Sequence, residues 1–281
     1  MLVNTRVGNG NSLGNYISQT RAFLRVKDIG LKWSAAAANT LTRLKQLRYS
    51  TNQKQPVTVD FIRAVMNDGA VPLVLRVVIA VAFRLGARVH EIIAKRVVRS
   101  GVTHWLVPIW RSSVRWDTVT GDYALRNDMS KSDKYNKGTD MFLLNTGKPN
   151  CITRWFGQYF NNLPAAEADT PLFVFDDGTP VQYQHVLSVF KSHAHVIGLT
   201  PEQVGTHSAR IGFIFTAKNN ALQWDLVDAV VRWAPQSAAA MHLVYDRMSR
   251  ERLMQAAAAV DTDNPAAVPL AVVSRRLQLQ Q

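Results

Sequence analysis

The sequence has little of what several common protein classes require. Its 281 residues include one cysteine, Cys151, which excludes a disulfide scaffold and a cysteine-rich zinc module. No stretch reaches the roughly 18 uninterrupted apolar residues of a membrane span, and the nearest, residues 70–83, contains Pro72 and Arg76. The N-terminus has no compact apolar signal core, and no glycine-rich phosphate loop occurs. We therefore expect an intracellular protein with no membrane partner.

Acidic residues are also scarce. There are 20 Asp and Glu against 33 Lys and Arg, for a net charge of +13, which indicates a polyanionic partner. Residues 1–55 hold nine of the cations and a single acid, Asp28. This arm is either a solvated basic helical face or a contact surface for a phosphate backbone. We favour the second, with these DNA-binding candidates: Arg21, Arg25, Lys27, Lys32, Arg43, Lys45, Arg48 and Lys54.

The hydrophobic pattern predicts three regions. Residues 1–55 form a basic helical region with helices over 16–24 and 34–47, and a polar run ending at Pro56 separates it from a main domain over 56–260. The remaining residues, 261–281, form a flexible tail. Within the main domain we expect helices over 57–66, 72–83, 87–98, 152–160 and 186–197, the last ended by Gly198, and more helices after Pro201.

A small sheet interrupts these helices. Residues 102–110, 114–119 and 139–144 are rich in β-branched and aromatic residues, and Gly121 and a polar loop over 127–138 separate them. The predicted fold class is therefore mainly α with a small antiparallel β-sheet (α+β).

Three short patterns contain residues that suit an anion. Arg88 precedes Glu91 by three residues, so the carboxylate can orient the guanidinium. His207 and Arg210 have the same spacing, which puts an imidazole and a guanidinium on one helical face. Tyr245 lies near arginines that favour its phenolate. Each pattern alone is more often a surface ion pair or a packing residue, and only the combination is informative.

Two patterns that resemble metal sites are set aside. His193 and His195 lack a third ligand at metal spacing. Residues 176–178 begin like a calcium loop but lack its later ligands, so we expect a turn there. We predict no metal and no cofactor.

The order of the anion-binding residues resembles the tyrosine recombinase (phage-integrase-like) family over about residues 56–250. The run from His207 to Gly212, His-Ser-Ala-Arg-Ile-Gly, is close to the family's most specific signature. The run from Ser130 to Asp133, Ser-Lys-Ser-Asp, matches the loop that bears the family's lysine. The resemblance implies a catalytic set, supported by Glu91, of Arg88, Lys131, His207, Arg210, Trp233 and Tyr245.

The resemblance also implies a function. Family members are site-specific DNA recombinases or integrases that cleave and rejoin strands through a 3′-phosphotyrosine intermediate, with neither metal nor ATP. They act on double-stranded DNA as homo-oligomers, commonly tetramers. The Ser-Lys-Ser-Asp and Arg-Trp runs are most similar to the eukaryotic mobile-element branch, such as DIRS-type retrotransposons. An element of that branch acts in the nucleus.

Two departures from the family pattern leave alternatives open. The spacing between Trp233 and Tyr245 is about three residues longer than is usual in the family, and the extra residues form either one further helical turn or a longer loop. The family's N-terminal DNA-clamping domain is also usually longer than residues 1–55. The alternatives are a type IB topoisomerase-like enzyme that relaxes DNA and a catalytically decayed DNA-binding protein. Trapping of a covalent complex on a nicked duplex separates an enzyme from a binding protein.

Overall fold

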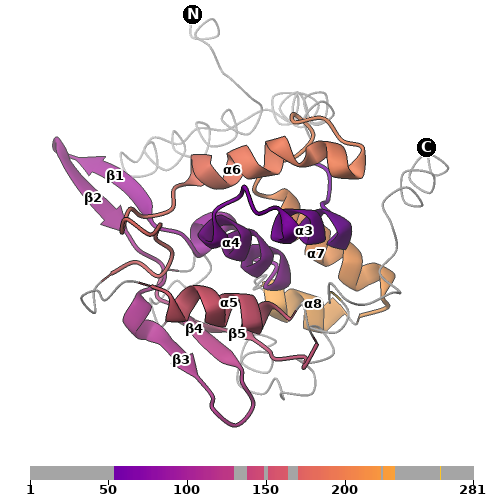
Figure 1. The fold of residues 1–281 in the computed structure, drawn as a ribbon, viewed down its shortest axis with the longest axis horizontal. Coiled ribbons are helices and arrows are strands. Elements are labelled where there is room, and N and C mark those ends of the chain that lie inside the picture. The colour runs from indigo at the N-terminus through magenta and orange to yellow at the C-terminus, as the bar shows by residue number, and fades with distance from the viewer. Residues whose placement is uncertain are drawn as a thin grey trace, which may run out of the picture. The chain divides into compact units, whose positions relative to one another are not determined.

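The structure, a computed structural model, describes residues 54–129, 138–148, 151–163, 170–222, 224–231 and 260. The chain divides into two units between Gln53 and Lys54. The helices expected over 16–24 and 34–47 and the tail over 261–281 lie outside the described residues. The described part of the second unit combines helices with small antiparallel sheets (Figure 1). This arrangement confirms the predicted α+β class, whereas the predicted domain limits stay predictions.

A helix that is apolar on nearly every side forms the centre of the second unit. Ten of the 12 residues of α4 (Leu73–Arg84) are buried, as its composition predicts. Pro72 occupies the N-cap, where its missing N–H removes no helical hydrogen bond. Four helices pack against α4 (Figure 1): α3 (Val59–Asn67), α5 (Ile152–Asn161), α6 (Tyr183–Ser192) and α7 (Ser208–Asn219). None of the described helices is long and apolar enough to cross a membrane.

The surrounding helices largely follow the expected ranges. Thr58 caps α3, where its hydroxyl accepts a hydrogen bond from the amide of Phe61. The single helix expected over 186–197 is two elements, α6 and the 3-10 helix η3 (Ala194–Ile197). Gly198 ends η3 with a left-handed φ of 68°, as predicted. The last helix, α8 (Trp224–Val231), contacts α7.

Three strands form an antiparallel sheet in the order β3 (Val114–Trp116), β4 (Tyr123–Asn127) and β5 (Thr139–Leu143). The expected strands over 114–119 and 139–144 correspond to β3 and β5, while the central strand β4 was not expected. Leu125 of β4 lies opposite Val114 on one side and Met141 on the other. These three side chains bring the sheet to the hydrophobic core.

The helix expected over residues 87–98 is wrong. This segment forms the 3-10 turn η1 (Val89–Glu91) and then β1 (Lys95–Arg99), which pairs antiparallel with β2 (Val102–Leu106). Ser100 and Gly101 connect the strands with φ values of 50° and 77°, the left-handed conformations that a two-residue hairpin turn requires. The β-branched residues on both strands favour this pairing over a helix.

Candidate active site

Arg88 lies in the turn that follows α4. Gly86 makes this turn with a φ of 52°, and a Cβ atom there would lie 2.6 Å from Cγ1 of Val231, so the position requires glycine. Arg88 caps η1, and the Glu91 carboxylate accepts hydrogen bonds from its amide at 3.0 Å and from its Nη1 at 2.8 Å. Glu91 is buried, whereas the Arg88 side chain is 32% exposed. A buried carboxylate therefore holds a guanidinium that still reaches solvent.

Arg210 comes from the first turn of α7 and is only 1% exposed. Its Nη1 donates to the backbone oxygen of Gly86 at 2.9 Å, and its Nη2 donates to that of Val231 at 2.6 Å. Its Nη1 also lies 3.9 Å from Oε2 of Glu91. A buried guanidinium without such partners would strongly destabilise the fold. Glu91 thus lies between the two arginines that the sequence singles out.

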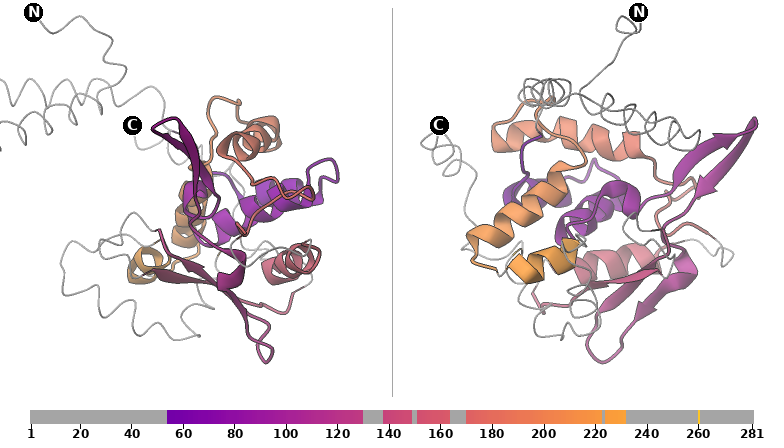
Figure 2. Two further views of the ribbon diagram at one scale, coloured as in Figure 1. Left: turned by 90° about the vertical axis from the view of Figure 1, so that its left-hand side faces the viewer. Right: turned by 180° about the vertical axis from the view of Figure 1, so that it is seen from behind.

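The signature run at the start of α7 has a packing explanation. The buried Ser208 hydroxyl accepts a hydrogen bond from the Gly205 amide at 3.1 Å. A Cβ atom on Gly212 would lie 2.1 Å from the backbone oxygen of Val57, and the Val57 amide donates to the Ser208 oxygen at 3.2 Å. The small residues let α7 lie against residue 57, and this close approach carries Arg210 into the core. Figure 2 shows α7 beside α4 from behind, with α8 next to α7.

His207 occupies the N-cap of α7, three residues before Arg210. Partial burial is the largest cause that lowers its pKa below 6.5, followed by the charges of Arg210 and Arg88. The neighbouring His90 acts in the same direction, and Glu91 opposes the shift. The imidazole is therefore mainly neutral at pH 7 and can accept a proton.

Asn127, at the end of β4, makes contacts next to the predicted site residues that the sequence analysis missed. It is fully buried, and its Nδ2 donates to the backbone oxygen of Glu91 at 2.7 Å. Its Oδ1 accepts from the amide of Met129 at 2.8 Å. One side chain thus joins the Arg88 turn to the start of the loop that contains Lys131. An asparagine before a polar loop is too common to signal this role.

The structure brings together Arg88, Glu91, His207 and Arg210. Other predicted site residues lie outside the described residues: Lys131, Trp233, Tyr245, Arg21, Arg25, Lys27, Lys32, Arg43, Lys45 and Arg48. Two of these follow described parts of the site in the sequence. Trp233 comes two residues after Val231, whose oxygen binds Arg210, and Lys131 comes four residues after Asn127.

Lys54 is the one DNA-binding candidate within the described residues. Its Nζ donates to the backbone oxygen of Glu202, and the next residue, Gln55, donates its amide to the oxygen of Gln203 at 2.8 Å. Residues 54 and 55 therefore lie against the loop that leads to His207. The role of Lys54 in DNA binding stays a prediction.

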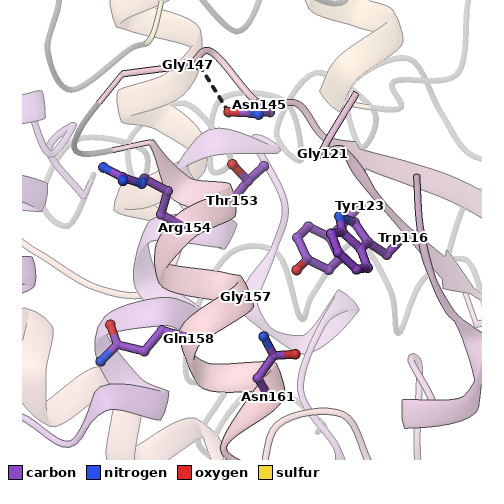
Figure 3. Close-up of a pocket in the computed structure, with 10 residues that line it drawn as sticks. All are labelled: Trp116, Gly121, Tyr123, Asn145, Gly147, Thr153, Arg154, Gly157, Gln158 and Asn161. Carbon is purple, nitrogen blue, oxygen red and sulfur yellow. Dashed lines mark hydrogen bonds between the residues drawn. The ribbon is translucent and has the colours of Figure 1, made fainter. Parts of the chain in front are cut away.

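A cavity of about 530 Å³ between the β3–β4 connection and α5 shares no lining residue with this site (Figure 3). The rings of Trp116 and Tyr123 stack there with centroids 6.2 Å apart. Thr153, Arg154 and other residues of α5 line the opposite wall. None of the predicted catalytic residues lines this cavity.

The histidine pair set aside as a metal site has a structural role. His193 Nε2 lies 3.1 Å from Oδ2 of Asp68, and its Nδ1 lies 3.1 Å from the oxygen of Val189. Among the residues that the structure describes, no three His, Cys, Asp or Glu side chains are grouped so that they could hold a metal ion. The segment over 176–178 forms a turn in which Asp177 accepts from the amide of Thr179 at 2.8 Å.

Comparisons with known proteins gave matches only among solved structures. No family model matches the chain, and no curated protein matches it. The XerH site-specific recombinase bound to its difH substrate in a pre-cleavage complex is 16% identical with a TM-score of 0.46, over 90% of this chain and 71% of that one. The post-cleavage complex of XerH on palindromic difH is 14% identical with a TM-score of 0.46, over 73% of this chain and 52% of that one.

The integrase from mycobacterium phage Brujita is 14% identical with a TM-score of 0.48, over 92% of this chain and 80% of that one. These solved proteins are a site-specific recombinase and a phage integrase, the class that the motifs of this chain resemble.

Proposed function

We propose that this protein cleaves and rejoins DNA strands as a site-specific recombinase or integrase of the tyrosine recombinase type. The observation that supports this most is the position of Glu91 between the guanidinium groups of Arg88 and Arg210, beside His207. Two arginines, one carboxylate and a neutral imidazole carry a net charge of +1. That charge complements the single negative charge of a phosphodiester.

The two arginines have different tasks in this proposal. Arg88 is 32% exposed and can donate N–H groups to a non-bridging phosphate oxygen. Arg210 is buried, and the low polarity of its surroundings strengthens the effect of its charge on the transition state. Glu91 holds the guanidinium of Arg88, and the backbone oxygens of Gly86 and Val231 hold that of Arg210. Both groups are therefore in place before DNA binds, so the site needs little rearrangement.

In the proposed reaction, the phenol oxygen of Tyr245 attacks phosphorus while the bond from phosphorus to the 5′ oxygen breaks. The phenol proton passes to His207, and Lys131 donates a proton to the departing 5′ oxygen. Trp233 donates its indole N–H to a phosphate oxygen. The 3′-phosphotyrosine ester keeps the energy of the broken bond. Attack by a 5′-hydroxyl from another strand therefore reverses these steps without ATP.

We propose that residues 1–55 contribute to DNA binding. This arm has a net charge of +8, which suits contacts to the phosphates of double-stranded DNA. Strand exchange between two duplexes requires four cleavages, and we propose a homo-tetramer on DNA that supplies one Tyr245 for each. We place its action with the host DNA inside the cell, and in the nucleus for a eukaryotic DIRS-type element.

Covalent trapping tests this function and requires no chosen target sequence. A library of nicked duplexes of random sequence is incubated with the protein, and adducts that resist SDS are recovered. At a nick the short 5′-hydroxyl fragment diffuses away, so each phosphotyrosine accumulates. We expect adducts from the wild type and none from Tyr245→Phe, although both retain DNA in a filter-binding assay. Retention of DNA without wild-type adducts would instead indicate the decayed DNA-binding protein.

A joining assay separates the recombinase from a topoisomerase. Two differently labelled duplexes that contain a sequence recovered from the library are mixed with the protein. A recombinase yields products that carry both labels. A type IB topoisomerase-like enzyme instead relaxes a supercoiled plasmid and yields no joined product.

A further inference from the structure

The strands β1 and β2 form a two-stranded ribbon, residues 95–106, that projects beyond the helices (Figures 1 and 2). Within the described parts of the chain, no other strand pairs with the ribbon. Its apolar side chains are unusually accessible, with Val98 63% exposed, Val102 56% and Trp105 37%. Open strand edges and exposed apolar side chains in one element are typical of a binding surface.

The ribbon carries positive charge and no acid. Lys95, Arg96 and Arg99 belong to β1, and the sequence has no Asp or Glu between Glu91 and Asp117. The resulting charge of +3 complements a polyanion rather than the mixed charges of an average protein surface.

One face of the ribbon combines a guanidinium with apolar groups. Arg96 lies opposite Trp105, and Val98 lies opposite Thr103, so the alternation of strand side chains puts all four on the same face. Arg96 Nη2 donates to the hydroxyl of Thr103 at 3.4 Å. Arginine donors to guanine and apolar contacts to the thymine methyl group are two of the contacts that read base edges in the major groove.

The ribbon begins next to the candidate active site. A cleft of about 530 Å³ at its base is lined by residues that include His90, Lys95, Arg96 and Met129. His90 follows Arg88 by two residues, and Met129 precedes Lys131 by two. A duplex with a phosphate at Arg88 therefore passes close to the base of the ribbon.

We infer that the β1–β2 ribbon inserts into the major groove of the duplex beside the cleaved phosphate, an inference that rests on the proposed function. A two-stranded ribbon fits this groove, which is about 12 Å wide. Five residues of strand span about 17 Å, which is about half a turn of DNA. The face with Arg96 and Val98 contacts base edges, and Lys95 contacts a phosphate at the groove margin.

Disulfide cross-linking to DNA tests the groove directly. Val98→Cys puts a thiol on the base-contacting face. The matched control is Val119→Cys in the β3–β4 connection, where the wild-type valine is 92% exposed. The native Cys151 is 1% exposed and does not compete. The probe is a mixed-sequence duplex of about 30 base pairs, or three turns. It carries a thiol tether either in the major groove, on cytosine N4, or in the minor groove, on guanine N2.

We expect Val98→Cys to cross-link to the major-groove tether several-fold more than to the minor-groove tether, and several-fold more than Val119→Cys does. Equal yields from the two variants, a minor-groove preference or no cross-link to a duplex that the variant binds would overturn the inference. In a second arm, Lys95→Gln combined with Arg96→Gln should reduce the slope of log affinity against log salt by about 1, because Lys95 is the member of the pair that contacts a phosphate.

The outcomes distinguish a failure of the ribbon proposal from a failure of the proposed strand-transfer activity. An unchanged salt slope in the double variant overturns the ribbon assignment alone. If that variant also alters the oligomeric state in sedimentation, the ribbon is instead a protein-contact surface. A wild type that binds no duplex overturns both proposals. Groove-specific cross-linking without a Tyr245 adduct supports the ribbon and overturns the strand-transfer function.

Discussion

The guanidinium of Arg210 donates to the backbone oxygen of Gly86 at 2.9 Å, across 124 positions of sequence. Gly86 precedes Arg88 by two residues, so this bond fastens α7 to the turn that presents the other arginine. Glu91 adds a second connection, because its carboxylate binds Arg88 and lies 3.9 Å from Arg210. The two arginines therefore act as one unit with Glu91, and a change in one member should affect the others.

Glu91→Gln should lower the free energy of unfolding by about 3–5 kcal/mol, because it removes a buried negative charge beside the buried Arg210. Urea denaturation measures this loss. Asp60→Asn is the control, since it removes an exposed pair with Arg63 of the same spacing and should cost less than about 1 kcal/mol. Equal losses in the two variants would contradict the role given to Glu91.

Asn127→Ala should lower stability by about 1–3 kcal/mol and also impair formation of the covalent complex. It removes the bonds to the Glu91 oxygen and the Met129 amide that connect the Arg88 turn to the lysine loop. Asn145→Ala loses comparable bonds to Thr120 and Gly147, away from the site. It should lose stability but form the adduct normally per folded molecule. If both variants behave alike, Asn127 has a structural role only.

Acidification should destabilise the wild type partly through His207. Its pKa is lowered below 6.5 in the folded protein, so the unfolded chain binds the proton more readily, and stability falls as the pH drops through this window. His207→Gln removes that contribution. Urea denaturation at about pH 7.5 and about pH 5.5 should therefore give a smaller stability loss for the variant than for the wild type. An identical loss would rule out the His207 contribution.

Lys131→Ala should slow cleavage of normal DNA by about 100-fold or more, because the 5′ oxygen then departs without a proton. A 5′-bridging phosphorothiolate substrate should restore most of the rate, since a thiolate leaves without acid help. Arg88→Ala should gain nothing from the sulfur, because its task is charge stabilisation. Rescue of Lys134→Ala or Lys137→Ala in place of Lys131→Ala would show that a different loop lysine is the acid.

Local sequence patterns predicted much of the fold. The apolar run after Pro72 predicted α4 because a helix buried on all sides needs no polar face. The spacing of Arg88 to Glu91 predicted an ion pair because both side chains belong to one short turn. Gly198 marked the end of η3 because its left-handed φ strongly favours glycine.

Other features depend on partners that are distant in the sequence. Residues 87–98 have helical spacing, but β1 exists because Val97 and Val98 pair with His104 and Thr103 of β2. The role of Asn127 depends on the Glu91 oxygen, 36 positions earlier. The β-branched residues of both strands are a local signal for the β1–β2 pair, but they do not specify its register. The contact of Asn127 has no local signal, because it arises only when the chain has folded.

Identification of the DNA-linked residue tests the central claim most directly. Trypsin should release residues 233–247 as one peptide, which contains Tyr245 as its only tyrosine. After nuclease treatment of the trapped adduct, fragmentation in a mass spectrometer locates the remaining nucleotide. We predict a nucleotide on Tyr245 joined through its 3′ phosphate. A nucleotide on another residue, or one joined through a 5′ phosphate, would contradict the proposed strand transfer.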